Sequence, residues 1–150
     1  MKNYIGVKQI LAEPMNLGDY NKFKGWTIPE NEDPNKEGYK VVYSDDYVSW
    51  SPKDAFEEAY KETSGLTFGL AVEAAKKGMK VARKGWNGSN MFAYIVPANS
   101  YPAATKIAKE YWGENLVPYR AYWALKTAQE DVATWTPSGS DTLAEDWFIL

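Results

Sequence analysis

Apolar and polar residues alternate along the first part of the chain, which is the pattern of short β-strands. The run YIGVKQILA predicts a strand over residues 4–12, and YKVVYSDDYVSW predicts two strands over residues 39–50 joined by a turn at residues 44–46. Between them, residues 15–26 are expected to form a short helix or an irregular turn, followed by an acidic loop. The next run, SPKDAFEEAYKE, predicts a helix with Ser51 as its N-cap and Pro52 as its first residue.

The pattern restarts after Ser64-Gly65, which predicts a boundary between residues 62 and 63. Thr67 is expected to cap a second helix that ends at Gly78, because the intervening apolar residues recur at helical spacing. Short strands are predicted over residues 79–86 and 91–97, with the sequence GWNGSN reversing the chain between them. Alternation in the second of these strands places Met91, Ala93 and Ile95 on one face, and Phe92, Tyr94 and Val96 on the other.

The remaining segments predict further small elements. Residues 100–113 are expected to form a short helix capped by Ser100, or else a long inserted loop, because their apolar stripe is weak. Residues 118–138 predict a hairpin that turns at residues 129–131. Asp141 is expected to cap one helical turn before a terminal strand, in which Trp147, Phe148 and Ile149 are expected to lie in the core. The expected fold class is α+β, with two small units, residues 1–62 and 63–150, each a short antiparallel sheet packed with one or two helices.

The composition limits the chemistry that the chain can perform. It contains no Cys and no His, which excludes disulfides, thiol nucleophiles, the usual zinc sites and imidazole bases. No compact acidic cluster suggests a Mg²⁺ site either. We therefore expect neither catalysis nor a metal or cofactor.

The charge distribution bears on the partners of the protein. The net charge is −3; residues 1–62 carry eight basic and twelve acidic side chains, and residues 63–150 carry nine and eight. Neither part is basic enough to favour binding to a nucleic-acid polymer. No apolar run approaches the roughly 20 residues that span a bilayer, and the N-terminus lacks the apolar centre of a signal peptide. A cytoplasmic protein without a membrane partner is expected.

Trp86 in the turn GWNGSN is the first candidate for function, and it has two interpretations. In one, Asn87-Gly88 supplies positive φ angles to a hairpin turn and Trp86 packs on the sheet. In the other, Trp86 stacks on a nucleotide base, Asn87 binds the edge of that base, and Arg83 and Lys84 meet phosphates.

The sequence TWTPSGSDTLAEDW, residues 134–147, is the second candidate. Asp141 is a plain helix cap in one interpretation. In the other, a loop of Ser138, Gly139 and Ser140 beside Trp135 offers hydroxyl and backbone N–H groups to ribose and phosphate oxygens. The adjacent acids Glu145 and Asp146 do not suggest a catalytic dyad, because neighbouring residues on a helix do not face each other.

Residues 66–150 resemble the phage Thoeris anti-defence proteins of the second type. The helix start TFG, the turn RKGWNG and the terminal run SDTLAEDW occur in the same order as in that family. Residues 1–62 precede the usual start of the family and resemble short phage proteins of unassigned role. The segment 97–120 is longer than the hairpin connection of compact family members, so the rim of the family's ligand pocket is expected to differ in this chain.

The resemblance implies a homo-oligomer, usually a tetramer, that captures a cyclic ADP-ribose isomer, and in some relatives cyclic dinucleotides, in pockets between subunits without cleaving them. Its pocket residues, carried over by position, are Trp86, Asn87, Trp135, Pro137, Ser138 and Asp141. Arg83, Lys84, Phe92 and Lys126 are added on chemical grounds. Two alternatives remain open: a nucleotide hydrolase with Asp141 or Glu145 as its base, and an interaction module without a ligand.

Overall fold

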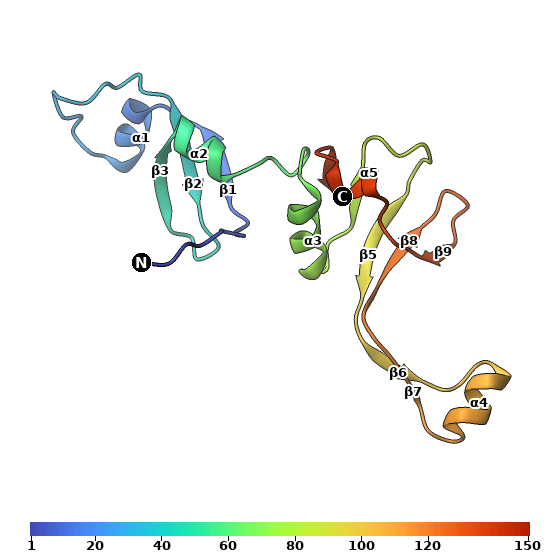
Figure 1. Cartoon of the computed structure of the whole chain (residues 1–150). Coiled ribbons are helices and arrows are strands. Elements are labelled where there is room, and N and C mark those ends of the chain that lie inside the picture. Colours follow the sequence, from blue (N-terminus) through green and yellow to red (C-terminus); the bar gives the residue numbers. More distant parts are fainter. The chain divides into compact units, whose positions relative to one another are not determined.

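The computed structural model describes residues 1–150, and the chain divides into two units, Met1–Lys61 and Glu62–Leu150. Both combine antiparallel strands with short helices, which confirms the α+β fold class (Figure 1). Each unit has its own sheet and its own buried residues. No helix is both long and apolar enough to cross a membrane.

The first unit is built on a three-stranded sheet of order β1-β2-β3. Its strands are β1 (Leu11–Pro14), β2 (Gly38–Val42) and β3 (Val48–Pro52), and its helices are α1 (Leu17–Lys24) and α2 (Lys53–Ala59). Tyr20 and Val41 are the large buried side chains of this unit. The predicted helix in residues 15–26 and the predicted hairpin in residues 39–50 are confirmed.

Two predictions for the first unit are wrong. The strand begins at Leu11 instead of residue 4, because the five residues of β2 provide partners only for Leu11–Pro14. Ser51 does not cap a helix, because it continues β3 and pairs with Tyr39. The helix therefore starts at Lys53, with Pro52 at the cap position and no side-chain hydrogen bond there.

The second unit contains a five-stranded antiparallel sheet of order β10-β4-β5-β8-β9. These strands are β4 (Val81–Arg83), β5 (Phe92–Val96), β8 (Tyr122–Lys126), β9 (Val132–Thr134) and β10 (Trp147–Ile149). Helix α3 (Phe68–Lys76) packs on β4, β5 and β10. The core cluster lies between this helix and the sheet; its members are Leu66, Ala71, Ala74, Ala75, Val81, Ala93 and Trp147.

The helix signals around α3 are confirmed. The Thr67 side chain accepts a hydrogen bond from the Leu70 amide, which satisfies a free N–H of the first turn. At the other end, Gly78 has a φ of +86°, where glycine avoids the steric cost of a side chain. The predicted alternation is confirmed within β5, since Ala93 and Ile95 face the core cluster, but Met91 lies before the strand and does not join that cluster.

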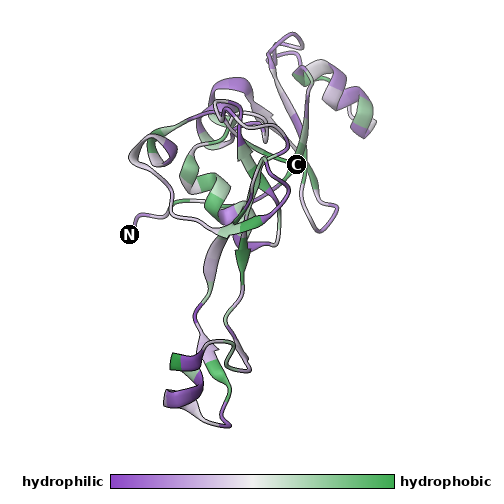
Figure 2. Ribbon diagram, turned by 90° about the vertical axis from the view of Figure 1, so that its right-hand side faces the viewer, coloured by the Kyte–Doolittle hydropathy of each residue, from purple (hydrophilic) through white to green (hydrophobic).

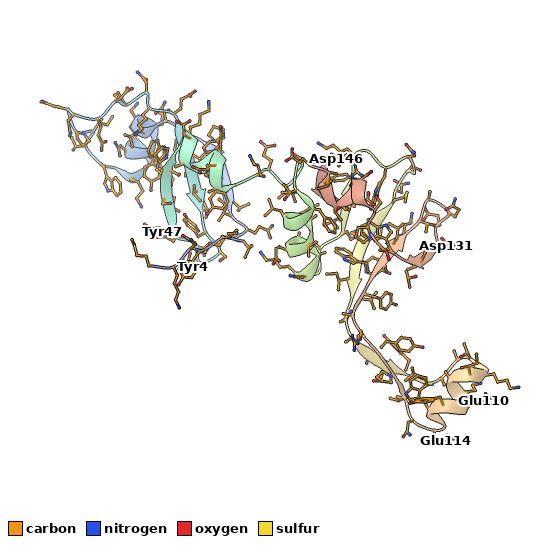
Figure 3. All side chains as sticks on the ribbon, in the orientation of Figure 1. Tyr4, Tyr47, Glu110, Glu114, Asp131 and Asp146 are labelled. Carbon is orange, nitrogen blue, oxygen red and sulfur yellow. The ribbon has the colours of Figure 1, made fainter.

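A two-stranded ribbon of β6 (Asn99–Tyr101) and β7 (Val117–Tyr119) extends β5 and β8, and it carries α4 (Lys106–Trp112) at its end (Figure 1). We call residues 97–121 the arm; Glu110 and Glu114 mark its far end in Figure 3. Thr105 caps α4, and Ser100 does not, because Ser100 pairs with Pro118 in the ribbon. No residue of α4 is buried, and the helix shows both hydrophobic and hydrophilic surface (Figure 2).

Candidate ligand-binding site around Asp141

Asp141 lies in the short helix α5 (Gly139–Leu143), but it is not the cap that the sequence predicted. Ser138 is the N-cap, because its hydroxyl oxygen accepts a hydrogen bond from the Asp141 amide at 3.1 Å. The Asp141 carboxylate in turn accepts a hydrogen bond from the Ser138 amide at 2.9 Å, which completes a reciprocal capping box. Asp141 is therefore the third residue of the helix, and its carboxylate points back toward the loop.

The residue Asp141 is only 8% exposed, and its carboxylate accepts four hydrogen bonds. Besides the amide, the Ser138 hydroxyl donates to Oδ2 at 2.9 Å. On Oδ1, Arg83 Nη1 donates at 2.8 Å and the Trp86 indole Nε1 at 3.1 Å. Arg83 and Trp86 belong to β4 and the following turn, and Ser138 precedes α5, so Asp141 joins the α5 loop to a segment more than 50 residues away.

Arg83 joins this carboxylate to a second one. Its Nε donates to Asp146 Oδ1 at 2.8 Å, and Asp146 Oδ2 accepts the Gly85 amide at 2.7 Å. Figure 3 shows Asp146 beside α5. The Arg83 side chain is only 17% exposed, so its charge is compensated within the unit by two acids.

The pKa values follow from these contacts. Burial by itself raises the pKa of Asp141, but the hydrogen bonds from Arg83, Ser138 and Trp86 together outweigh it and lower the pKa to about 2. The Arg83 guanidinium is also the main cause of a lowered pKa at Asp146. The hydrogen bonds that Arg83 donates to Asp146 and, second, to Asp141 raise the pKa of Arg83. All three groups are charged at neutral pH.

This network predicts a loss of stability in acid. Since the Asp141 pKa is about 2 in the folded unit and 3.8 ordinarily, its contribution is complete above the unfolded pKa and is lost as the pH falls through the folded one. The free energy of unfolding of the second unit should fall by about 2 kcal/mol from this group. Urea unfolding of the wild type and Asp141→Asn, followed by NMR signals from β4 and β5, measures it. If the free energy of unfolding fell equally with pH in both proteins between pH 5 and pH 2, the prediction would be contradicted.

Trp86 lies within a cluster of indole rings. Its ring meets Trp135 edge-on at 5.8 Å between centroids and Trp147 at 5.4 Å, and its indole N–H is bound to Asp141. Trp147 is fully buried, as expected, and donates to the Asp141 carbonyl at 2.9 Å. Trp86 is half-buried against the core, which matches the interpretation in which it packs on the sheet. The turn differs in one detail, because positive φ occurs at Asn90 and not at Asn87-Gly88.

Trp86 also lines a surface hollow of about 370 Å³. Small-molecule pockets typically measure about 300–1,000 Å³, so this hollow lies at the small end of that range. Arg83 and Lys84 line it together with apolar side chains, among them Met91, Phe148 and Leu150. Three of the predicted ligand-binding residues, Arg83, Lys84 and Trp86, therefore share one concave surface.

The other predicted site residues are placed differently. Trp135, Ser138 and Asp141 do not line the hollow; Trp135 belongs to the indole cluster, and Ser138 and Asp141 belong to the hydrogen-bond network. Asn87 is exposed and Pro137 is half-exposed, and neither lines the hollow. Phe92 and Lys126 pair with each other across β5 and β8, on the sheet face away from α3. Lys126 Nζ is bound to the Asn90 carbonyl at 3.0 Å and also to Glu130.

Several residues of this region were not predicted to belong to it. Asp146 completes the charge network, although the sequence marked it only as one of two adjacent acids. Met91, Phe148 and Leu150 line the hollow. The prediction that Phe148 lies in the core is wrong, because Phe148 alternates with Trp147 and Ile149, which pack in the core. That alternation in the terminal strand was the available signal that Phe148 lies on the opposite face of the sheet.

Comparison with known proteins identifies the family to which the second unit is similar. A family model described as the Tad2-like, Thoeris anti-defense 2-like domain matches residues 66–150. The protein "Thoeris anti-defense 2" of Bacillus phage SP01 is 37% identical over 86 residues, which are 57% of this chain and 94% of that relative. Because so little of the relative lies outside the match, it has no room for a unit like residues 1–61.

Proposed function

Because this chain belongs to the Thoeris anti-defense 2-like family, we propose that it counteracts Thoeris immunity by binding the cyclic nucleotide signal of that defence and withholding it without cleavage. The anti-Thoeris role follows from the family. The capture of a nucleotide, with a cyclic ADP-ribose isomer as the first ligand to test and cyclic dinucleotides as further ones, is the proposed part.

The main observation in favour of binding without cleavage is the environment of the Asp141 carboxylate. A general base works best when its pKa lies near the working pH, whereas the pKa of Asp141 is about 2. Its carboxylate already accepts four hydrogen bonds. These contacts favour a role in holding the turn and the α5 loop rigid, and they argue against the hydrolase alternative that uses Asp141.

The hollow supports binding of a nucleotide. Trp86, Met91 and Phe148 offer apolar surface to a base. Lys84 is exposed and forms no ion pair, so its ammonium group is available to a phosphate. Arg83 is held by two carboxylates, so we assign it to the support of Trp86 and not to direct phosphate binding.

A second copy of the chain would enlarge this small hollow. The sheet face away from α3 carries Phe92, Tyr94 and Phe148, all half-buried, and no helix of the unit packs on it. The arm adds exposed apolar side chains at Ile107, Tyr111 and Leu116. We therefore include a homo-oligomer, with a tetramer as the expected state, in the proposal; assembly would cover these surfaces and complete the pocket.

A recovery experiment tests capture against cleavage. The full chain is incubated with a cyclic ADP-ribose isomer, unbound ligand is removed, and the protein is denatured by heat. On the proposed mechanism, the released nucleotide elutes unchanged by chromatography and mass spectrometry, in proportion to the protein present. A hydrolysed product would support the enzyme alternative, and no retained nucleotide would support the interaction module.

A further inference from the structure

The first unit contains a groove of about 670 Å³ that lies outside the region matched by the family. It runs between α1, the loop after this helix, and β3, and four aromatic side chains line it: Tyr20, Trp26, Tyr47 and Trp50. The rings of Tyr20 and Trp26 are nearly perpendicular, at 81° and 6.0 Å between centroids. Two rings at this angle form a corner with aromatic surface on both sides.

The polar groups of two of these rings are already used inside the unit. Tyr20 donates its hydroxyl to the Val48 carbonyl at 3.3 Å, and Trp50 donates its indole N–H to the Met15 carbonyl at 2.7 Å. Burial, followed by the nearby Tyr47, raises the pKa of Tyr20, so this side chain stays neutral. These two residues therefore present neither a charge nor a free donor to a ligand. Because Tyr20 is buried, the accessible aromatic surface belongs to Trp26, Tyr47 and Trp50.

The groove is lined by one acidic side chain, Glu32, and one basic one, Lys24, and the neighbouring loop is acidic. The Glu32 carboxylate forms no ion pair, and its only hydrogen bond comes from the side-chain amide of the buried Asn21 at 3.3 Å. The loop around it, residues 30–37, carries four acidic side chains and one basic one. Aromatic faces attract cations through the negative potential of their π-systems, and a nearby carboxylate strengthens that attraction.

We propose that this groove binds an organic cation, a trimethylammonium or guanidinium group, between Trp26 and its aromatic neighbours and beside Glu32. The protein itself shows this interaction, because Lys24 places its ammonium group 5.4 Å from the centre of the Trp26 ring. Lys24 also lines the groove and is exposed, so a better-fitting cation displaces it. An anionic nucleotide does not fit the acidic loop, which separates this inference from the function proposed for the second unit.

Choline and its uncharged carbon isostere, dimethylbutanol, provide a test because they share shape and differ in charge. Both are titrated into the full-length protein while the indole NMR signals of the first unit are followed. Choline should shift the Trp26 and Trp50 signals in a saturable manner, and dimethylbutanol should bind about 5- to 30-fold more weakly. Equal affinities for choline and dimethylbutanol would overturn the proposal.

Variants locate the binding. Trp26→Ala removes a 57% exposed ring and Glu32→Gln removes the charge alone, so both should weaken choline binding about 5-fold or more. Phe23→Ala is the matched control, because Phe23 is 53% exposed on α1 and does not line the groove. It should leave the affinity unchanged. Lys24→Ala should raise the affinity, because it removes the competing ammonium group. If Phe23→Ala weakened choline binding as much as Trp26→Ala, the groove assignment would be wrong.

The source of the cation is distinguished in the same assay. Free arginine amide is compared with a capped pentapeptide that carries one central arginine between glycines. If the peptide binds at least about tenfold more tightly than the free amide, the natural ligand is a side chain on a protein partner. Equal binding, or preference for choline, indicates a small molecule. Both results support the organic cation; failure of all three probes to bind would overturn it.

Discussion

Replacing Arg83 with methionine is expected to lower the free energy of unfolding of the second unit by about 3 kcal/mol. Removing one member of a buried ion pair leaves the other member charged without compensation, and here two carboxylates lose their shared partner. Asp141 is 11% exposed at its side chain, but Asp146 is 31% exposed and remains partly hydrated. For that reason the lower end of the usual range of about 3–5 kcal/mol applies.

Lys84→Met is the matched control for this substitution. Lys84 is the next residue in the chain, and its exposed side chain forms no ion pair, so its replacement should change stability by less than about 0.5 kcal/mol. Urea unfolding followed by NMR signals of β4 and β5 compares both variants with the wild type. A further variant, Arg83→Met with Asp141→Asn, should recover part of the loss, because it removes one uncompensated charge. Similar stability in the two single variants would refute a structural role for Arg83.

The parts of the fold that were predictable from sequence depend on local signals. Thr67 and Gly78 mark the ends of α3, because a cap and a positive φ each depend on a few neighbouring residues. The hairpin predicted within residues 118–138 is present as β8 and β9, and Glu130 in its turn has a φ of +67°. Each of these signals depends only on residues that are close together in the sequence, so a single sequence is enough to detect it.

The errors arise where a distant partner decides the structure. Residues 4–10 have the alternation of a strand, yet β2 is too short to pair with them. Ser51 and Ser100 look like caps, yet each pairs within a strand. In the site, Arg83 and Asp141 are 58 residues apart, so nothing local indicated that Arg83 would be compensated by carboxylates instead of being free for phosphate.

Each of the two units has its own aromatic surface, the groove in the first unit and the hollow in the second. The family model matches residues 66–150, which lie within the second unit, so the family resemblance concerns that unit. The first unit adds a groove with aromatic rings and a carboxylate, whereas the hollow in the second unit combines aromatic rings with an unpaired lysine. Ligands of opposite charge are therefore the expected difference between them.

Trp86→Ala should weaken binding of a cyclic ADP-ribose isomer about 5- to 150-fold, which corresponds to about 1–3 kcal/mol for one stacked base. Trp86→Phe should have a smaller effect, because phenylalanine keeps an aromatic face at the hollow while losing the N–H that binds Asp141. Titration calorimetry on folded protein measures both. Both variants lose the hydrogen bond to Asp141, but only Trp86→Ala loses the aromatic ring. The ratio of their affinities for the ligand therefore reports the contribution of the ring.

Trp26→Ala is the control from the other unit, and it makes the test reciprocal. Trp26 lines the groove of the first unit, so its loss should leave nucleotide binding unchanged while weakening choline binding. Trp86→Ala should do the reverse, because Trp86 contacts only the second unit. If Trp86→Ala stays folded and binds the nucleotide as tightly as the wild type, then Trp86 serves only the packing around Asp141. In that case the ligand does not stack on this ring, and the hollow beside it is not the nucleotide site.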